Sequence, residues 1–303
     1  MGRDRMASSE STAAADVEVV TTITGIRRIT DGHRTTGRSV GFVPTMGYLH
    51  DGHGSLMRAA AAGNDVVVAS IFVNPLQFGP GEDLESYPRD LDRDRSLAAA
   101  NGADVVFVPT AIEMYPLGEV LTTVSVAELS QRWDGESRPT HFAGVATVVS
   151  KLFNIVGSCR AYFGEKDFQQ LAIIRRMVAD LSMPVEVVGC PIIREPDGLA
   201  MSSRNVYLSA ENRSAAIVLR RALDAGEQAI GGGETDPAAV ARVMRSVVDD
   251  EPRARLDYVA VVDPATLKTP AVIGSETRLL IAAHLGATRL IDNCSVRSGP
   301  EPA

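Results

Sequence analysis

Two histidines three residues apart, His50 and His53, are the residues of this sequence best suited to phosphate chemistry. They follow a short apolar run at residues 40–43 and a turn marked by Pro44 and Gly47, an order that predicts strand, turn and helix. Such a junction directs unpaired helix N-terminal amides out of the carboxyl edge of a parallel sheet, where phosphates bind. Both rings would share one helix face and could donate to one phosphate chain. An ordinary turn with two surface histidines is the competing interpretation.

A second candidate is the charged turn around Lys166, which follows a short apolar run at residues 161–163. A lysine at the carboxyl end of a strand can reach phosphate oxygens as a point charge. Asp167 beside it can cap the next helix or hold a ribose hydroxyl. An ordinary exposed turn would have the same composition.

A third candidate is the polar loop at residues 201–208, which carries Ser202, Ser203 and Arg204. Two hydroxyls and a guanidinium supply no nucleophile without a base, but they suit binding and neutralising a polyphosphate. The loop falls at the expected boundary between two domains. A loop in that position can close over a bound nucleotide and exclude water.

Neutral side chains form a fourth set. Asn74 and Gln77 follow a run at residues 65–73 that predicts a buried strand, and Gln170 lies one helical turn after Lys166. Such amides can orient a small polar substrate by hydrogen bonds, although exposed loop amides are the simpler interpretation.

Arg138 and His141 precede an apolar helix predicted at residues 144–156. That helix can line a pocket for an apolar part of a substrate.

Composition narrows the function classes. The chain has 303 residues, with 30 Lys+Arg against 38 Asp+Glu, and its net charge of -8 argues against a nucleic-acid partner. No apolar run reaches the length of a membrane-spanning helix, and residues 1–16 lack the apolar core of a secretory signal. Cys159, Cys190 and Cys294 are scattered, which favours reduced thiols in a cytoplasmic protein.

The elements that must position these groups alternate in type, which predicts a doubly wound, Rossmann-like α/β domain with a parallel sheet over residues 17–192. Residues 1–16 are expected to form a mobile tail, and residues 193–303 a smaller α+β domain. Predicted strands in the first domain span 39–43, 65–73, 104–108, 161–163 and 185–193, and predicted helices span 54–62, 91–101, 144–156 and 169–181. In the second domain, helices are predicted at 210–230 and 237–250, and strands at 257–262, 278–284 and 288–293.

Five segments, in this order, resemble the pantothenate synthetase (pantoate–β-alanine ligase) family within the HxGH nucleotidyltransferase superfamily. The resemblance spans about residues 20–295. The segments are Pro44-Thr45-Met46-Gly47 with His50 and His53; Phe72-Val73-Asn74-Pro75 with Gln77 and Phe78; Arg138-Pro139-Thr140-His141-Phe142-Ala143-Gly144-Val145; Phe163-Gly164-Glu165-Lys166-Asp167 with Gln169 and Gln170; and Met201-Ser202-Ser203-Arg204-Asn205.

The resemblance implies a ligase that condenses pantoate with β-alanine at the expense of ATP, through a pantoyl adenylate, to give pantothenate, AMP and pyrophosphate. It implies His53, His50, Lys166 and Arg204 as catalytic residues, with His53 as the usual proton donor. The implied ATP site is Met46, Gly47, Tyr48, Leu49, His50, Asp51, Gly52, His53, Gly164, Glu165, Lys166, Asp167, Ile193, Met201, Ser202, Ser203 and Arg204.

The implied pantoate ligands are Gln77 and Gln170, and the implied β-alanine ligands are Gln77, Asn74 and Tyr87. The dimethyl side of pantoate would need an apolar wall, for which the predicted helix offers Val145, Val148, Val149 and Leu152. Magnesium is expected with ATP, held by phosphate oxygens and water, with Asp92 and Asp94 as possible contacts. A homodimer is implied as well.

Two positions depart from the family pattern. Gly54 stands where a larger apolar residue is more usual, and Tyr48 stands where alanine is usual. Because glycine in a helix costs about 0.5–1 kcal/mol relative to alanine, we expect a looser first helical turn.

Several alternatives stay open at this point. A related ligase acting on a different acid or amine, or a nucleotidylyltransferase of the same superfamily, would carry the same histidine motif. A hydrolase could use His50, Asp51 and His53 as zinc ligands. A nucleotide-binding protein without catalysis is a further alternative, and an oxidoreductase lacks support because no Gly-x-Gly-x-x-Gly follows the first strand.

Overall fold

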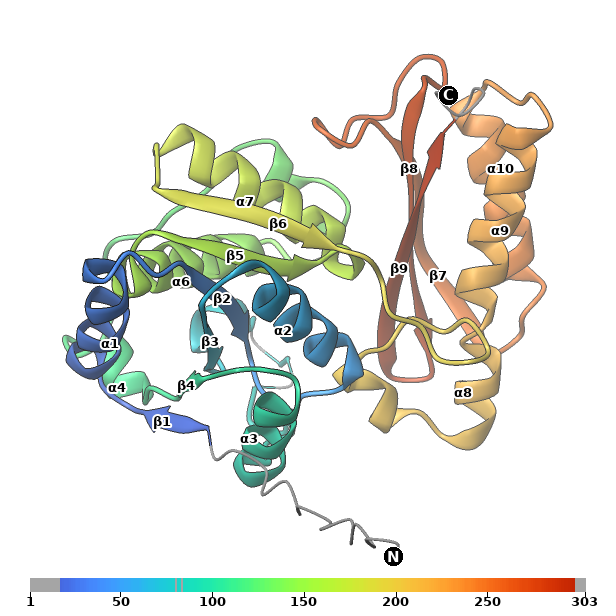
Figure 1. The fold of residues 1–303 in the computed structure, drawn as a ribbon. Coiled ribbons are helices and arrows are strands. Elements are labelled where there is room, and N and C mark those ends of the chain that lie inside the picture. Colours follow the sequence, from blue (N-terminus) through green and yellow to red (C-terminus); the bar gives the residue numbers. More distant parts are fainter. Residues whose placement is uncertain (1–16, 80, 83, 298–303) are drawn as a thin grey trace, which may run out of the picture.

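The computed structural model describes residues 17–79, 81–82 and 84–297. These residues form a six-stranded parallel sheet followed by a three-stranded antiparallel sheet, each with its own helices (Figure 1). The predicted class, a doubly wound domain followed by a smaller α+β domain, is confirmed. The predicted tail at residues 1–16 lies outside the described residues.

The first sheet consists of short apolar strands. Its order is β1 (Glu18–Val20), β4 (Val105–Phe107), β3 (Val66–Ile71), β2 (Val40–Thr45), β5 (Cys159–Gly164) and β6 (Val185–Cys190), and every pairing is parallel. The central strands are buried on both faces because helices cover each side, which explains why their sequences are continuous apolar runs.

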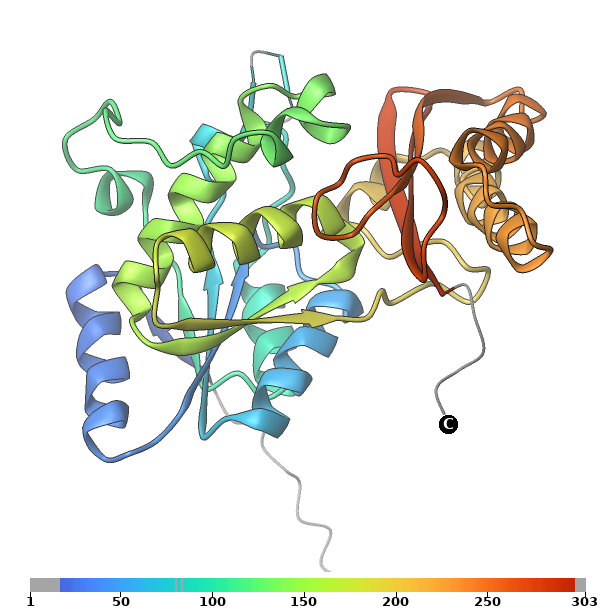
Figure 2. The same cartoon turned by 90° about the horizontal axis from the view of Figure 1, so that it is seen from above.

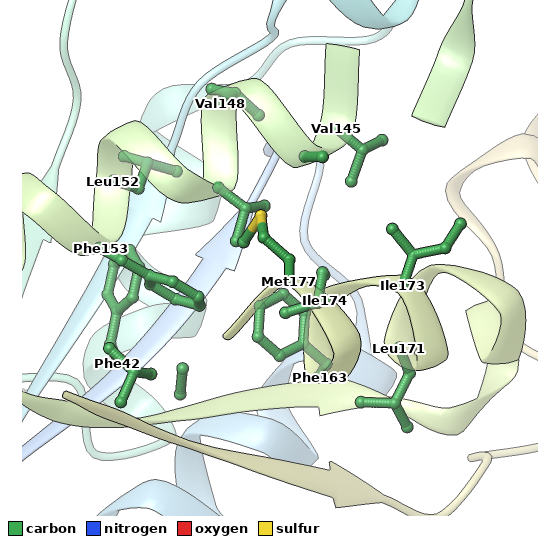
Figure 3. Packing of buried hydrophobic residues seen from close by; sticks show 14 of the residues in the cluster. Phe42, Val145, Val148, Leu152, Phe153, Phe163, Leu171, Ile173, Ile174 and Met177 are labelled. Carbon is green, nitrogen blue, oxygen red and sulfur yellow. The ribbon is translucent and has the colours of Figure 1, made fainter. Parts of the chain in front are cut away.

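Helices cover both faces of this sheet (Figure 2). On one face lie α1 (Ile23–Thr35), α6 (His141–Val156) and α7 (Phe168–Asp180), and on the other lie α2 (Asp51–Gly63) and α3 (Leu91–Ala100). Successive residues of β2 serve the two sides: Phe42 packs in the core under α6 and α7, and Val43 packs under α2. Figure 3 shows Phe42, Phe153 and Phe163 meeting between this sheet and α6.

Short elements lie mainly in the loops at the carboxyl edge and in the connection between β4 and α6. They are α4 (Ala111–Met114), α5 (Asp134–Ser137) and the 3-10 turns η1 (Pro75–Gln77), η2 (Leu129–Gln131), η3 (Glu165–Asp167) and η4 (Ser203–Tyr207).

The strand order places the functional edge between β2 and β5. From β2 the chain proceeds to β3 and β4 on one side, and β5 and β6 continue on the other. Ligands of open α/β sheets bind at such a reversal, beyond the carboxyl ends of the strands. The loop after β2 carries the two histidines and the loop after β5 carries Lys166, so the topology brings the first two candidate segments together.

The second sheet contains β7 (Ala254–Val262), β8 (Glu276–Leu285) and β9 (Thr288–Arg297). Helices α9 (Val218–Gly231) and α10 (Pro237–Asp249) cover one face. Residues of the opposite face, including Val262 and Leu280, join the core of the first domain. The boundary predicted at residues 192/193 falls between the two sheets.

Several predicted element bounds were wrong. The single helix predicted at residues 210–230 is two helices, α8 (Ala210–Ala215) and α9, because Leu219 N–H bonds the carbonyl of Ala216 and tightens the chain into a turn. Helices α2 and α6 each begin three residues earlier than predicted, and β1 and α1 were not predicted.

The expected looseness of the first turn of α2 is also wrong. Gly54 N–H donates to the His50 carbonyl at 3.0 Å, so the turn is closed. Gly54 is buried, and a Cβ there would lie 2.8 Å from Oδ1 of Asn101 at the end of α3. The glycine therefore leaves room for the side chain of Asn101, which a larger residue would have to displace.

The structure describes no helix that is long and apolar enough to cross a membrane.

Replacement of Gly54 by leucine is expected to lower the free energy of unfolding by about 1 kcal/mol or more, because the added side chain must displace Asn101. The matched control is Gly32→Leu in α1, where nothing lies within 4 Å and the change should stabilise by up to about 1 kcal/mol. Urea unfolding of both variants measures the difference. Equal effects at the two positions would contradict the packing role of Gly54.

Candidate active site

The two histidines cap the helix on which they stand. Nδ1 of His50, the N-cap of α2, accepts from Gly52 N–H at 3.2 Å, and Nδ1 of His53 accepts from the backbone N–H of His50 at 3.3 Å. This is a reciprocal capping box in which imidazoles replace the usual hydroxyl and carboxylate. The ring centroids lie 4.1 Å apart.

Both caps determine where the ring protons lie. A nitrogen that accepts a backbone N–H carries no proton, so in each neutral ring the proton is on Nε2. Burial, together with Lys166, lowers the pKa of His50 to about 4. Burial, together with His50, lowers the pKa of His53 to about 3. At neutral pH the pair therefore offers two uncharged Nε2–H donors.

A buried carboxylate fixes the loop before these histidines. Asp94 of α3 is 1% exposed and accepts from the backbone N–H groups of Tyr48 and Leu49 at 2.7 and 2.6 Å. Tyr48 has a φ of 49°, a conformation uncommon for a side chain of this size. The two charge-assisted hydrogen bonds hold that turn and thereby set the start of α2.

The lysine loop after β5 is held by the second domain. Nδ2 of Asn293 donates to the carbonyls of Glu165 and Lys166 at 3.0 and 2.8 Å. Nζ of Lys166 lies 3.4 Å from Oδ1 of Asp167. Burial opposes ionisation of Asp167, but Lys166 and Arg204 together bring its pKa below the usual value. The loop thus presents a lysine in a fixed position with a charged aspartate beside it.

The serine–arginine loop lies against the loop that precedes α3. Oγ of Ser202 accepts from Arg204 N–H at 3.3 Å, and the hydroxyls of Ser203 and Tyr87 lie 3.3 Å apart. Tyr207 donates to the Ser86 carbonyl at 3.2 Å. These contacts join the two loops over the carboxyl edge of the sheet.

Gln169 has a structural role, whereas Gln170 and Gln77 face the cavity. Gln169 is buried and bonds three backbone groups between residues 129 and 134, so it is structural. Gln170 faces the cavity between the domains. Gln77 also faces the cavity, and its Oε1 accepts from Nδ2 of Asn74 at 3.1 Å.

A glycine on α6 permits the position of Gln77. A Cβ at Gly144 would lie 1.9 Å from the carbonyl oxygen of Leu76, so η1 packs backbone against backbone on α6. Asn74 completes this contact by donating to the Gly144 carbonyl at 3.2 Å.

These groups surround one cavity of about 860 Å³. The apolar wall predicted on α6 lines it, and Phe142 and Phe163 extend that wall. The predicted site residues on its surface are Met46, His50, Gly52, His53, Gln77, Tyr87, Gly164, Lys166, Asp167, Gln170, Ile193, Met201, Ser202, Ser203 and Arg204.

The other predicted ligands lie off the cavity surface. Asn74 is fully buried and uses both ends of its amide on Gln77, Gly144, Leu76 and Tyr115, so it positions Gln77 instead of facing a ligand. The remaining residues off the cavity surface are Gly47, Tyr48, Leu49, Asp51 and Glu165. The N–H groups of Tyr48 and Leu49 are bound to Asp94, and Asp51 is exposed. Glu165 pairs with Arg278 at 3.1 Å.

The two possible magnesium contacts are also elsewhere. Both oxygens of Asp94 accept backbone N–H groups, and Asp92 is exposed on α3 with its side chain beside Arg95. Among the described residues, no group of three or more His, Cys, Asp or Glu side chains is arranged to hold a metal ion.

Several positioning residues were not predicted from the sequence. Asp94 and Asn293 act on backbone groups of segments far away in sequence, and no local pattern identifies such partners. Arg289 of β9, which also lines the cavity, pairs with Asp134 of the first domain at 2.5 Å and with Asp257 of its own domain at 2.8 Å. Its contribution depends on the arrangement of the domains.

A parallel sheet whose reversal point carries neutral histidine donors at a helix start, with a lysine opposite, defines a nucleotide-binding α/β enzyme of the HxGH type. Comparisons specify it further. The family described as Pantoate-beta-alanine ligase matches residues 18–295. The pantothenate synthetase of Sinorhizobium medicae is 54% identical over 278 residues, covering 91% of this chain and 95% of the relative. That of Moorella thermoacetica is 53% identical over 277 residues, covering 91% and 98%.

Solved structures agree. Pantothenate synthetase from Thermus thermophilus has a TM-score of 0.86 at 49% identity, covering 92% of this chain and 99% of its own. The pantoate-beta-alanine ligase of Francisella tularensis, solved in complex with beta-gamma ATP and beta-alanine, has a TM-score of 0.76 at 33% identity, covering 92% and 97%.

The chain therefore belongs to the pantoate-beta-alanine ligase family. It is a ligase that forms a C–N bond between pantoate and β-alanine.

The buried histidines make stability depend on pH in a definite direction. The pKa values of His50 and His53 are lowered by folding, so the unfolded chain binds protons first. Their contribution is complete above about pH 6.5 and declines as the pH falls toward 4, by up to about 1.4 kcal/mol per pH unit for each histidine.

We expect the double variant His50→Asn/His53→Gln to weaken this dependence, because asparagine and glutamine preserve a capping box but do not titrate. Urea unfolding at pH 7, 6, 5 and 4.5 measures the slope. His141, whose pKa is also lowered to about 4, is present in both proteins and cancels from the comparison. Parallel curves for variant and wild type would show that the two rings are not held neutral.

Proposed function

We propose that this ligase acts in two steps through an acyl adenylate. The carboxylate of pantoate attacks the α-phosphorus of MgATP, which forms a C–O–P linkage and releases pyrophosphate. The amine of β-alanine then attacks the acyl carbon, which forms the amide and releases AMP. The observation that carries this proposal is that His50, His53 and Lys166 line one cavity together with two glutamines and an apolar wall.

The first step needs alignment and charge neutralisation more than it needs a base, because a carboxylate is already a nucleophile. The Nε2–H groups of His50 and His53 supply uncharged donors at the helix start, and Lys166 supplies a point charge from the adjacent strand. Arg204 and the two serines act from the loop over the cavity. Donors on several sides of a polyphosphate can follow charge as it moves onto the leaving pyrophosphate.

Pantoate would lie between the amides and the α6 wall. Gln77 and Gln170 supply neutral hydrogen-bonding groups for its hydroxyls, and Val145, Val148 and Leu152 face the geminal dimethyl group. An apolar wall this close to the reacting carboxylate excludes water, which would otherwise hydrolyse the adenylate.

The magnesium ion would accompany ATP as part of the substrate. Magnesium keeps water ligands and is commonly bound through substrate phosphates and few protein groups. The arrangement of carboxylates here suits this mode, since Asp92 and Asp94 do not line the cavity. When bound, the ion neutralises charge on the departing pyrophosphate.

We also propose that the enzyme is a cytoplasmic homodimer. Three large apolar side chains are exposed within one short segment: Ile112 at 79%, Leu117 at 96% and Leu121 at 88%. We propose that these side chains form part of an interface between copies of the chain, because burial against a partner would remove their apolar surface from water. The three cysteines are buried free thiols, which suits a reducing compartment.

His53→Ala and Lys166→Ala are each expected to lower adenylate formation by more than about 100-fold, the scale of losing one transition-state donor. Pantoate-dependent exchange of pyrophosphate into ATP measures that step alone. His33→Ala and Lys268→Ala, which change the same residue types outside the cavity, should retain near-normal exchange. Near-normal exchange in either active-site variant would contradict the assigned roles.

Leu121→Asp is expected to shift the enzyme from dimer to monomer, because it places a charge in the proposed apolar contact. Sedimentation velocity at matched concentration measures the change. The control is Val272→Asp, which alters another exposed apolar residue, 61% exposed, in the second domain. A wild-type enzyme that sediments as a monomer would overturn the dimer proposal.

A further inference from the structure

One backbone oxygen organises a part of the cavity to which the proposed reaction has so far assigned no role. The carbonyl oxygen of Gln77 accepts from Nδ1 of His141 at 2.9 Å and from Nη2 of Arg138 at 3.3 Å. Both side chains line the cavity beside Gln77. Because they share one acceptor, these two nitrogens lie at most about 6 Å apart.

The shared carbonyl settles which nitrogen of His141 carries the proton. A carbonyl oxygen only accepts, so Nδ1 is the donor and the lone pair of the neutral ring is on Nε2. This is the opposite tautomer to that of His50 and His53. Burial, reinforced by Arg138, lowers the pKa of His141 to about 4, so the ring is neutral at pH 7. Nε2 makes no hydrogen bond to the residues that the structure describes.

Like His141, Arg138 uses only some of its nitrogen atoms in hydrogen bonds to the protein. Its Nε and Nη2 donate to the two carboxylate oxygens of Glu82 at 2.8 and 2.5 Å, and Nη2 also donates to Gln77. Its Nη1 donors have no hydrogen-bond partner in the described part of the chain. Glu82 therefore orients the guanidinium and leaves one edge for a ligand.

The other cations on the described cavity surface are less suited to bind the carboxylate of a ligand. Lys166 lies beside Asp167 on the phosphate side, and Arg204 belongs to the loop over the nucleotide. Arg289 is bound by two carboxylates, Asp134 and Asp257. Arg138 is the cation that combines an open donor edge with a neighbouring acceptor.

We propose that Arg138 and His141 form the subsite for zwitterionic β-alanine, with Nη1 of Arg138 binding the carboxylate and Nε2 of His141 accepting a hydrogen bond from the amine. The inference rests on the proposed function and deepens it. A zwitterion has no net charge, so it can dock beside the Arg138–Glu82 pair without displacing Glu82. It needs a donor and an acceptor at the spacing of its own ends.

This arrangement gives each residue a distinct task. Arg138 selects an amine that carries a carboxylate, and His141 directs the nitrogen toward the acyl carbon held beside Gln77. The ring is too weak a base to take a full proton from an ammonium group. The zwitterion therefore loses one proton to water before its nitrogen attacks, and the nitrogen loses a second proton to water as the acyl–oxygen bond breaks and AMP departs. His141 is therefore a binding and orienting residue.

Arg138→Gln tests the carboxylate contact, because adenylate formation does not require β-alanine. We expect pantoate-dependent pyrophosphate exchange to stay within about threefold of wild type, while KM for β-alanine rises roughly 10- to 100-fold, the scale of one charged hydrogen bond. With β-alaninamide, which lacks the carboxylate, kcat/KM should be nearly the same in variant and wild type. Arg138→Lys should recover part of the preference for β-alanine. Arg132→Gln, which removes an arginine outside the cavity from the same segment, should leave that preference intact.

His141→Asn tests the amine contact without removing the contact to the fold. The asparagine Nδ2–H can still donate to the Gln77 carbonyl, but no group remains at the position of Nε2. We expect unchanged thermal unfolding, unchanged exchange and roughly a tenfold higher KM for β-alanine. His141→Gln, which can place an oxygen near the Nε2 position, should recover part of this loss.

The outcomes separate the two proposals. No pantoate-dependent exchange in the wild-type enzyme would refute the proposed function itself. Normal exchange with an unchanged KM for β-alanine in Arg138→Gln, or equal losses with β-alanine and β-alaninamide, would overturn the subsite. Loss of exchange in both Arg138→Gln and His141→Asn would also overturn it, because the two residues would then serve the first step or the fold.

Discussion

The active site depends on the way in which two histidines replace ordinary helix caps. A helix start has unpaired N–H groups that attract anions, and in many proteins those groups bind the phosphate directly. In α2 the rings of His50 and His53 accept two backbone N–H groups and present Nε2–H donors in their place. The donors therefore extend from the helix end by the width of an imidazole ring. Because the same hydrogen bonds cap the helix and select the tautomer, folding of α2 and preparation of the site are one event.

The second domain completes a site that the first domain begins. The parallel sheet brings the histidine loop and the lysine loop together at its reversal point, and the second domain supplies further contacts to the lysine loop. Asn293 of β9 binds the two carbonyls of that loop, and Arg278 of β8 pairs with Glu165 while stacking on Phe168 at 4.1 Å. The position of Lys166 is therefore coupled to the packing of the small sheet against the first domain.

The sequence was sufficient to predict what depends on local pattern. Continuous apolar runs identified the buried strands, and the five motifs identified the segments that meet at the cavity. It was insufficient where residues of one motif point in different directions. Leu49 is buried in the core, whereas the next residue, His50, faces the cavity. Likewise, Asn74 is buried, whereas Gln77 of the same motif faces the cavity. Helix 210–230 was predicted as one element because helix propensity hardly changes across the turn that divides it. Asp94 and Asn293 could not be predicted, since their partners are backbone groups brought close only by the fold.

One close contact between η1 and α6 positions the residues proposed to bind pantoate and those proposed to bind β-alanine. Because Gly144 has no side chain, the backbone of η1 approaches α6 until Asn74 bonds the Gly144 carbonyl, and this approach places Gln77. The side chain of Gln77 faces pantoate in the proposed reaction, while its carbonyl holds Arg138 and His141. A shift of η1 away from α6 would move the amide, the guanidinium and the imidazole together. If Gln77, Arg138 and His141 bind the substrates as proposed, changes at Gly144 would affect the binding of both pantoate and β-alanine through the position of η1.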